Sequence, residues 1–212
     1  MKTPLIALLA ATTALAAAPA LAQQAGDFTI GLGIGYVVPK DGNGSLANGT
    51  LSIDVGDSVR PTLTGEYFIY ENLGIELLAA WPFKHSISVD GVGKVADTTH
   101  LPPTLSLVYH FANQTVWTPY LGIGVNYTNF YDTDLTALGQ AALGVGPQAM
   151  KLGSSWGVAG MAGIDYDVSA RGAVRAEVRY IDINTDVTVN GAPVGTVHVD
   201  PWVFNAAYVF KF

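Results

Sequence analysis

Carboxylate and guanidinium side chains alternate with apolar residues in the segment Arg175–Arg179, which reads RAEVR. The carboxylates of Glu76 and Glu177 could form an acid–base pair, because two carboxylates in different environments can act as general acid and general base. The neighbouring arginines argue against this chemistry, since ion-paired arginines neutralise the carboxylates and build a structural network. We therefore interpret the set as a structural salt-bridge network and do not expect an enzyme.

A second candidate for catalysis is the pair Ser106 and His110, which share one face of a predicted strand. Nucleophilic catalysis requires the hydroxyl to lie within hydrogen-bond reach of the base. Four residues along a strand separate these two side chains by about 13 Å, at about 3.3 Å per residue. The segment Gly31–Gly35 (GLGIG) matches half of a dinucleotide-binding motif, but no helix follows it, so we interpret it as a small-residue strand face. No cofactor is expected.

The chain contains four histidines and no cysteine, so the residues that usually bind transition metals are few. No two histidines lie close together in the sequence, and we interpret them as polar residues of a rim or lumen rather than as metal ligands. Without cysteine, neither a disulfide framework nor a thiolate metal site can form. The histidines are His85, His100, His110 and His198.

The composition is typical of a membrane protein, with 50% hydrophobic and only 13% charged residues. After residue 22, no uncharged apolar run approaches the roughly 20 residues of a membrane-spanning helix. The first 22 residues combine Lys2, an apolar segment Leu5–Ala18 and small residues at Ala20 and Ala22, which predicts a cleaved secretory signal peptide before a single domain at 23–212. The net charge of −7 argues against nucleic-acid binding.

Alternating hydrophobicity predicts eight strands bounded by Gly, Pro, Asn and Asp clusters. The last one places aromatic residues on a single face, as in the outward face of a transmembrane barrel. The predicted strands are Asp27–Val38, Val59–Tyr70, Leu73–Phe83, Thr98–Ala112, Trp117–Phe130, Gly153–Val168, Gly172–Asn184 and His198–Phe212. Short and long connections alternate, as an up-and-down barrel requires. The long ones are Pro39–Ser58, Lys84–Asp97, Tyr131–Leu152 and Thr185–Val197.

The two faces of these strands differ in charge, which separates a membrane barrel from a soluble one. One face carries aliphatic and aromatic residues without charge, whereas the opposite face carries glycines and charged residues such as Glu66, Asp165 and Lys211. A lipocalin-like barrel would have its apolar face inside and its charges outside. We therefore predict an all-β, eight-stranded antiparallel up-and-down transmembrane β-barrel, which satisfies every backbone group without a free edge.

The lumen of this barrel is predicted to have two parts. Eight strands leave room for side chains or one small ligand, so a wide pore is excluded. Ionic residues gather in the periplasmic half and form a floor, namely Glu66, Glu76, Arg175, Glu177, Arg179 and Lys211. Inward positions of the upper half are apolar and predict a pocket above that floor, namely Leu78, Ala80, Ala159, Met161 and Val203.

Six stretches that cover most of the mature chain resemble the OmpW family of small outer-membrane barrels. They are NLGIELLAAWPFKH (Asn72–His85), HLPPTLSLVYHF (His100–Phe111), PYLGIGVNYTNFYD (Pro119–Asp132), SWGVAGMAGIDY (Ser155–Tyr166), VRYIDINT (Val178–Thr185) and DPWVFNAAYVFKF (Asp200–Phe212). The resemblance implies eight strands, a narrow hydrophobic upper lumen and uptake of small hydrophobic molecules with sideways release into the outer membrane. It also implies that Leu78 and Trp156 form the constriction. Family members also act as colicin receptors and respond to stress.

The predicted outer loops support an alternative function, in which the barrel is a structural or surface-interaction protein, for example a colicin or phage receptor. Acidic residues crowd these loops, either as solvated residues or as carboxylates bridged to lipopolysaccharide by divalent cations. The apolar segment 135–150 suits a short helix or lid, although its glycines equally suit a mobile coil. The expected partners are outer-membrane lipids, lipopolysaccharide and a small hydrophobic ligand.

Overall fold

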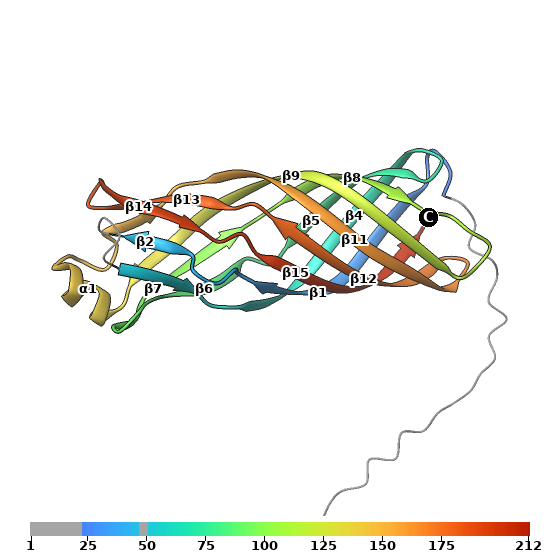
Figure 1. Ribbon diagram of the computed structural model, residues 1–212. Coiled ribbons are helices and arrows are strands. Elements are labelled where there is room, and N and C mark those ends of the chain that lie inside the picture. Colours follow the sequence, from blue (N-terminus) through green and yellow to red (C-terminus); the bar gives the residue numbers. More distant parts are fainter. Residues whose placement is uncertain (1–22, 47–50) are drawn as a thin grey trace, which may run out of the picture.

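The computed structural model describes residues 23–46 and 51–212, so the predicted signal peptide at 1–22 lies outside the described residues. Eight long antiparallel strands close into one barrel, because each strand pairs with the next barrel strand in sequence and the first pairs with the last (Figure 1). The predicted fold class is confirmed. The eight strands are β1 (Phe28–Val38), β4 (Ser58–Tyr70), β5 (Leu73–Ala80), β8 (Thr104–His110), β9 (Trp117–Leu135), β11 (Ser155–Ser169), β12 (Gly172–Ile181) and β15 (Trp202–Lys211).

Short turns join the strands at the end of the barrel where the chain terminates (Figure 1). The turn between β4 and β5 consists of Glu71 and Asn72, and Asn72 has a φ of 62°. Asparagine tolerates this left-handed conformation better than most residues, which suits it to a two-residue turn. Ala170 and Arg171 form the equally short turn between β11 and β12. The short turns thus lie together at one end, as predicted, and we call it the periplasmic end because outer-membrane barrels place their short turns there.

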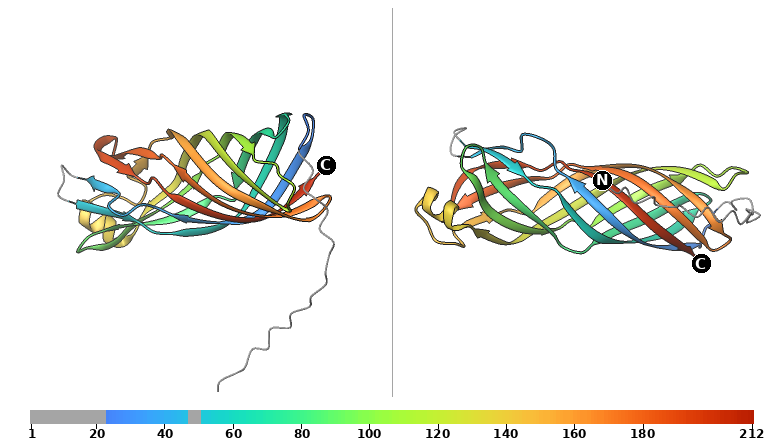
Figure 2. Two further views of the ribbon diagram at one scale, coloured as in Figure 1. Left: turned by 45° about the vertical axis from the view of Figure 1, so that its right-hand side comes forward. Right: turned by 90° about the horizontal axis from the view of Figure 1, so that it is seen from below.

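The four long connections are not irregular loops, which corrects the predicted strand limits. They form further strands that continue the barrel wall beyond the membrane-facing part, as Figure 2 shows. The reason is that alternate residues such as Ile87, Val187 and Val197 are apolar and pack inside this extension. Turn residues such as Asn190–Gly191 mark only the hairpin tips. The added strands are β2 (Gly44–Leu46), β3 (Leu51–Val55), β6 (Phe83–Val89), β7 (Gly93–Leu101), β10 (Met150–Leu152), β13 (Asn184–Val189) and β14 (Ala192–His198).

The apolar segment 135–150 contains one short helix, α1 (Ala137–Leu143), at the extended end of the barrel. The side chain of Thr136 caps its N-terminus by accepting a hydrogen bond from the backbone N–H of Gly139, and Gly144 ends it with a φ of 65°. Gly139 is buried, and a Cβ there would lie 2.2 Å from the carbonyl oxygen of Val95 on β7. The helix thus packs against β7, where its glycine permits close backbone contact.

The outer surface of the membrane-facing part is apolar and carries aromatic pairs at two levels. At the level where the extension begins, Tyr127 packs against Trp156 and Tyr180 packs against Trp202, with tilted rings whose centroids lie 4.8 and 5.3 Å apart. Near the periplasmic end, Trp117 and Tyr166 form a similar pair at 4.6 Å. Such aromatic belts mark the two membrane–water interfaces, with the aliphatic band between them. Among the described residues, no helix is long and apolar enough to cross a membrane.

Candidate binding site in the lumen

Arg175 is the centre of the ionic floor. Its guanidinium group donates to both carboxylate oxygens of Asp165, at 2.8 and 2.9 Å, and to Glu76 at 2.8 Å. Glu66 contributes a third carboxylate at 3.5 Å. Arg175 also lies over the ring of Tyr120, with 4.6 Å between its Cζ atom and the ring centroid. Each of these side chains is buried, so charged groups are tolerated here because each lies against a group of opposite charge.

Arg179 belongs to the same network and lies four residues after Arg175 on β12, further from the periplasmic end. It donates to Glu76 at 2.7 Å and to Glu177 at 3.0 Å, and it is fully buried. The hydroxyl of Ser106 lies 3.4 Å from its Nη1 atom. Ser106 therefore serves as a hydrogen-bond partner for an arginine, and the arrangement is that of an ion-paired network filling the barrel.

His110 and Tyr120 complete the floor, although the sequence did not assign them to it. His110 Nε2 lies 2.8 Å from Glu66 Oε1, and the hydroxyl of Tyr120 donates to Glu177 at 2.9 Å. The alternation of side chains along each strand predicts that His110 and Asp165 point inward. It cannot show which side chains of other strands they contact. Contacts between strands distant in sequence, such as β4 with β8 through Glu66 and His110, depend on barrel closure.

Lys211 does not join this network. Its ammonium group pairs with Asp167, an inward residue near the periplasmic end of β11. The predicted floor residues thus divide into one buried network, which holds Glu66, Glu76, Arg175, Glu177 and Arg179, and a separate ion pair below it.

Above the floor the lumen is apolar. Leu78 and Val203 are both only 6% exposed and line a small cavity of about 20 Å³ together with Ala80. Met161 is buried lower down, where it packs against Val108 and Tyr120 at the boundary with the floor. Apart from Thr62 and His100, the other side chains around the cavity are apolar as well, namely Val37, Phe83, Pro102, Ile181, Ile183 and Pro201.

Trp156 does not line the lumen, which corrects its assignment to the constriction. The residue is 72% exposed, and its indole packs at a tilt against the ring of Tyr127 on the outer surface. The physical reason is the strand period of two, because Ser155 next to it is buried and points inward. Trp156 is therefore part of the outer aromatic belt.

The barrel wall is interrupted next to the apolar cavity. The pairing of β5 with β8 ends at Leu78 and Thr104, and that of β6 with β7 begins at Phe83 and His100. Between these pairs the chain passes through Trp81–Pro82 on one side and Pro102–Pro103 on the other. Proline has no backbone N–H, so this interruption leaves few donors without a partner.

The proline carbonyl groups at the interruption accept hydrogen bonds from side chains, and that of Pro103 also accepts one from the backbone N–H of Tyr127. Asn126 on β9 is fully buried, and its amide donates to the carbonyl oxygens of Pro102 and Pro103 at 3.2 Å each. On the other side, Arg60 donates to the carbonyl oxygen of Pro82 at 3.1 Å. The wall can therefore be interrupted here without the energetic cost of unpaired backbone groups.

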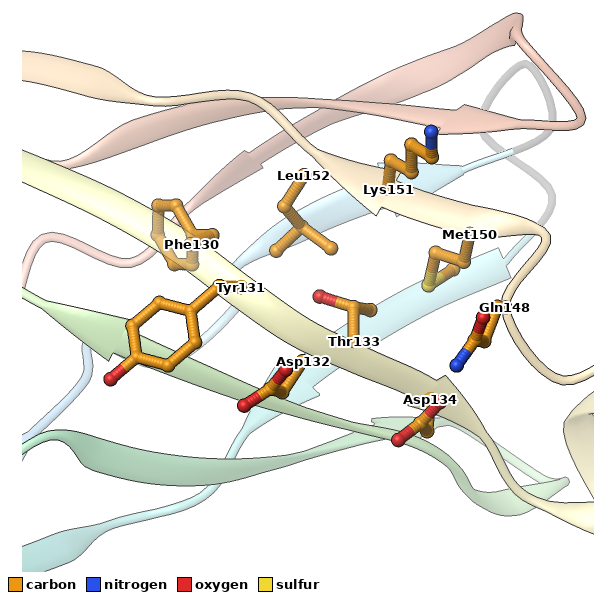
Figure 3. Close-up of a pocket in the computed structure, with 9 residues that line it drawn as sticks. All are labelled: Phe130, Tyr131, Asp132, Thr133, Asp134, Gln148, Met150, Lys151 and Leu152. Atoms are coloured by element: carbon orange, nitrogen blue, oxygen red, sulfur yellow. The ribbon is translucent and has the colours of Figure 1, made fainter.

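A larger groove of about 380 Å³ lies in the extension, between β9 and β10 (Figure 3). Asp132 and Asp134 are exposed on β9, and Gln148 and Lys151 line the groove from the β10 side. Its lining is mainly polar, unlike that of the cavity above the ionic floor. It is a feature of the outer surface rather than of the lumen.

Comparisons with known proteins agree with this architecture. The model of the OmpW family matches residues 24–212. The chain is 38% identical to outer membrane protein W of Vibrio cholerae, over 96% of this chain and 97% of that protein. It is 36% identical to the same protein of Escherichia coli over the full length of both. The crystal structure of OprG from Pseudomonas aeruginosa superposes with a TM-score of 0.78 at 36% identity, over 89% of this chain and 97% of that one. The chain therefore belongs to the OmpW family and is a β-barrel of the bacterial outer membrane.

Proposed function

We propose that the protein takes up small apolar molecules through its upper lumen and releases them sideways into the outer membrane. The observation that carries this proposal is the position of the apolar cavity, which lies above a closed ionic floor and beside the interruption of the barrel wall. An apolar molecule that leaves water for such a site gains about 25 cal/mol per Å² of buried surface.

The ionic floor blocks the route to the periplasm. A molecule that continued downward would have to separate Arg175 and Arg179 from the carboxylates of Glu76 and its neighbours. Leaving buried charges without partners costs about 3–5 kcal/mol, and a moving apolar solute offers no replacement. Exit to the side is less costly, because no ladder hydrogen bond spans the segment between Leu78–Thr104 and Phe83–His100.

Entry requires movement of the side chains that line the cavity. Its volume of about 20 Å³ accommodates roughly one water molecule. A ligand must therefore displace side chains such as Leu78, and these movable apolar groups act as the gate. The uptake is passive, because its direction depends only on the concentration of the solute.

Adjacent leucines of opposite orientation provide the test. Leu78 faces the cavity, whereas Leu77 is 50% exposed on the outer surface. We expect Leu78→Trp to fill the cavity and abolish uptake of a radiolabelled long-chain alkane by cells that lack other uptake routes. Leu77→Trp changes the same residue type on the lipid side and should leave uptake unchanged. Wild-type uptake by a correctly folded Leu78→Trp variant would refute the route through the lumen.

Release of the ligand sideways into the membrane can be tested separately by replacing the prolines at the interruption of the barrel wall. Replacing Pro102 and Pro103 by threonine restores two backbone donors and allows the ladder between β5–β6 and β7–β8 to close. We expect the double variant to bind the alkane in the lumen but to release it into the membrane more slowly. Unchanged release would show that exit takes another path.

The alternative is a surface-interaction function in which the extension, not the lumen, is active. The groove between β9 and β10 favours it, because the groove is polar and lies in the extended end of the barrel. Deleting α1 and the residues that follow it, 137–148, separates the two functions. Uptake through the lumen should survive this deletion, whereas receptor activity toward a colicin or phage should be lost.

A further inference from the structure

Two histidines lie inside the extension at the upper side of the apolar cavity, which His100 lines, and the proposed uptake route gives neither imidazole a role. His85 on β6 and His100 on β7 are 1% and 2% exposed, and their ring centroids are 4.8 Å apart. Phe83 and Phe130 pack edge-on against His100. Two buried imidazoles in an aromatic and aliphatic environment are costly unless their nitrogen atoms find partners.

One nitrogen of His85 has no hydrogen-bond partner in the part of the chain that the structure describes. Its Nδ1 atom lies 2.5 Å from the carbonyl oxygen of Gly56, and because a carbonyl can only accept, Nδ1 must carry the proton. The neutral ring then leaves Nε2 as a hydrogen-bond acceptor. This atom is buried and has no hydrogen-bond partner among the residues that the structure describes.

The unpartnered atom belongs to a residue that lines a second small cavity, of about 10 Å³, with walls that are otherwise mostly apolar. Val55, Ile87, Phe130 and Leu152 belong to these walls. His100 lines both this cavity and the one above the floor. Movement of the His100 ring would therefore join the two cavities into one path past His85.

The state of charge decides which ligand group fits here. Both histidines lie beyond the outer aromatic belt, and burial lowers the pKa of His100 to about 3 and also lowers the pKa of His85. At neutral pH the pair is therefore uncharged and offers an acceptor rather than a cation. Such a site favours a hydroxyl group or a protonated carboxyl group and gives no charge compensation to a carboxylate.

We propose that His85, packed against His100, is a polar recognition site in the upper lumen that accepts a hydrogen bond from the end group of an apolar ligand. The chain of the ligand then occupies the cavity beside Leu78. The inference rests on the proposed uptake function and narrows its substrates to apolar molecules with one terminal donor, such as long-chain alcohols. One such hydrogen bond corresponds to a roughly five- to tenfold gain in affinity.

The test compares two ligands of equal size in protein labelled with ¹⁵N-histidine and ¹³C-leucine methyl groups, in lipid nanodiscs. The ligands are 1-decanol, which has a donor, and 1-methoxynonane, which has the same atoms but no donor. Both should shift the Leu78 methyl signals, but only 1-decanol should move the Nε2 signal of His85. The alcohol should also bind roughly five- to tenfold more tightly.

Variants with matched chemistry complete the test. His85→Phe fills the aromatic site without an acceptor, so the alcohol and the ether should bind it equally well. His198→Phe alters an exposed histidine and should retain the preference of the wild type. If His85→Phe fails to fold, the Nε2 signal of the wild-type protein still decides the outcome.

Two different failures can be told apart. If both ligands shift Leu78 while the Nε2 signal of His85 stays unchanged, the recognition site is refuted and uptake through the lumen stands. If neither ligand shifts Leu78, no ligand enters the lumen, and both the recognition site and the uptake proposal are refuted.

Discussion

Arg175 and Asp165 form a bidentate ion pair inside the barrel, with two nitrogen–oxygen distances of 2.8 and 2.9 Å. The two residues are direct register partners on β12 and β11, so strand pairing alone brings them together. A second carboxylate, that of Glu76, reaches the same guanidinium group from β5. The network thus connects parts of the barrel wall that share no ladder hydrogen bonds.

Removing the central cation should destabilise the barrel strongly. Arg175→Met leaves Asp165 without its ion-pair partner and removes one of the two partners of Glu66 and of Glu76, and we expect the free energy of unfolding to fall by about 3–5 kcal/mol. Lys211→Met removes the cation that pairs with the buried carboxylate of Asp167 near the end of the lumen, and we expect a smaller loss than for Arg175→Met, because one carboxylate rather than three loses an ionic contact. Urea unfolding in lipid vesicles measures both. Equal losses would contradict the central position of Arg175.

Trp156 should matter for anchoring and not for uptake. Its indole packs on Tyr127 at the outer membrane interface, and an aromatic pair of this kind contributes about 1 kcal/mol. We expect cells that carry the Trp156→Ala variant to take up an alkane at the wild-type rate. The midpoint of urea unfolding of this variant should decrease slightly. If Trp156→Ala reduced uptake as strongly as Leu78→Trp, Trp156 would have to be part of the constriction after all.

Two glycines of β11 should differ sharply in their tolerance of alanine. A Cβ at Gly157 would lie 1.8 Å from the backbone carbonyl oxygen of Asp182, whereas a Cβ at Gly160 would meet nothing within 4 Å. We expect Gly157→Ala to cost about 1–3 kcal/mol through overpacking and Gly160→Ala to cost little. Thermal unfolding in the same detergent gives the transition temperatures of both variants. Equal transition temperatures would contradict the predicted difference between the two glycines.

Acid should loosen the extension through His100. Burial, together with repulsion from the imidazolium that His85 forms when it is protonated, lowers the pKa of His100 to about 3. A histidine in the unfolded chain titrates near 6.5. The unfolded chain therefore binds the proton first, so stability is complete above about pH 6.5 and is lost as the pH falls toward 3. Between pH 7 and pH 5 the loss should be about 2 kcal/mol.

The variant His100→Phe isolates this contribution. It removes the titrating group and keeps an aromatic ring between Phe83 and Phe130. Urea unfolding at pH 7 and pH 5 should show a smaller difference for the variant than for the wild type. The same pH dependence in both proteins would assign the acid sensitivity to other groups.

The sequence predicts the barrel well because strand alternation is a local property. Residues of β15 show this, since Val203 and Val209 are buried while Trp202 and Phe210 are exposed, as their spacing requires. The extension was missed because its connections contain Asp, Asn and Gly, which signal turns. In the structure these residues occupy hairpin tips such as Asn190–Gly191, and the strands continue on both sides.

The lumen was predictable in part, because inward positions can be listed from the sequence but their neighbours cannot. Leu78 and Val203 lie on β5 and β15 and meet around one cavity only because the barrel closes between them. The partner of Glu66 is His110, which follows it by 44 residues and could not be found from spacing. Trp156 was assigned to the lumen by family resemblance, whereas the alternation beside buried Ser155 would have placed it outside.

The floor around Arg175 also has an electrical consequence. Ions that crossed the barrel would have to displace guanidinium groups already paired with carboxylates at 2.7–2.8 Å. Bringing a further charge into such a site carries a large desolvation penalty, so the conductance of the barrel should be very low. A bacterium could therefore admit neutral solutes through this protein while its outer membrane keeps its resistance to ion leakage.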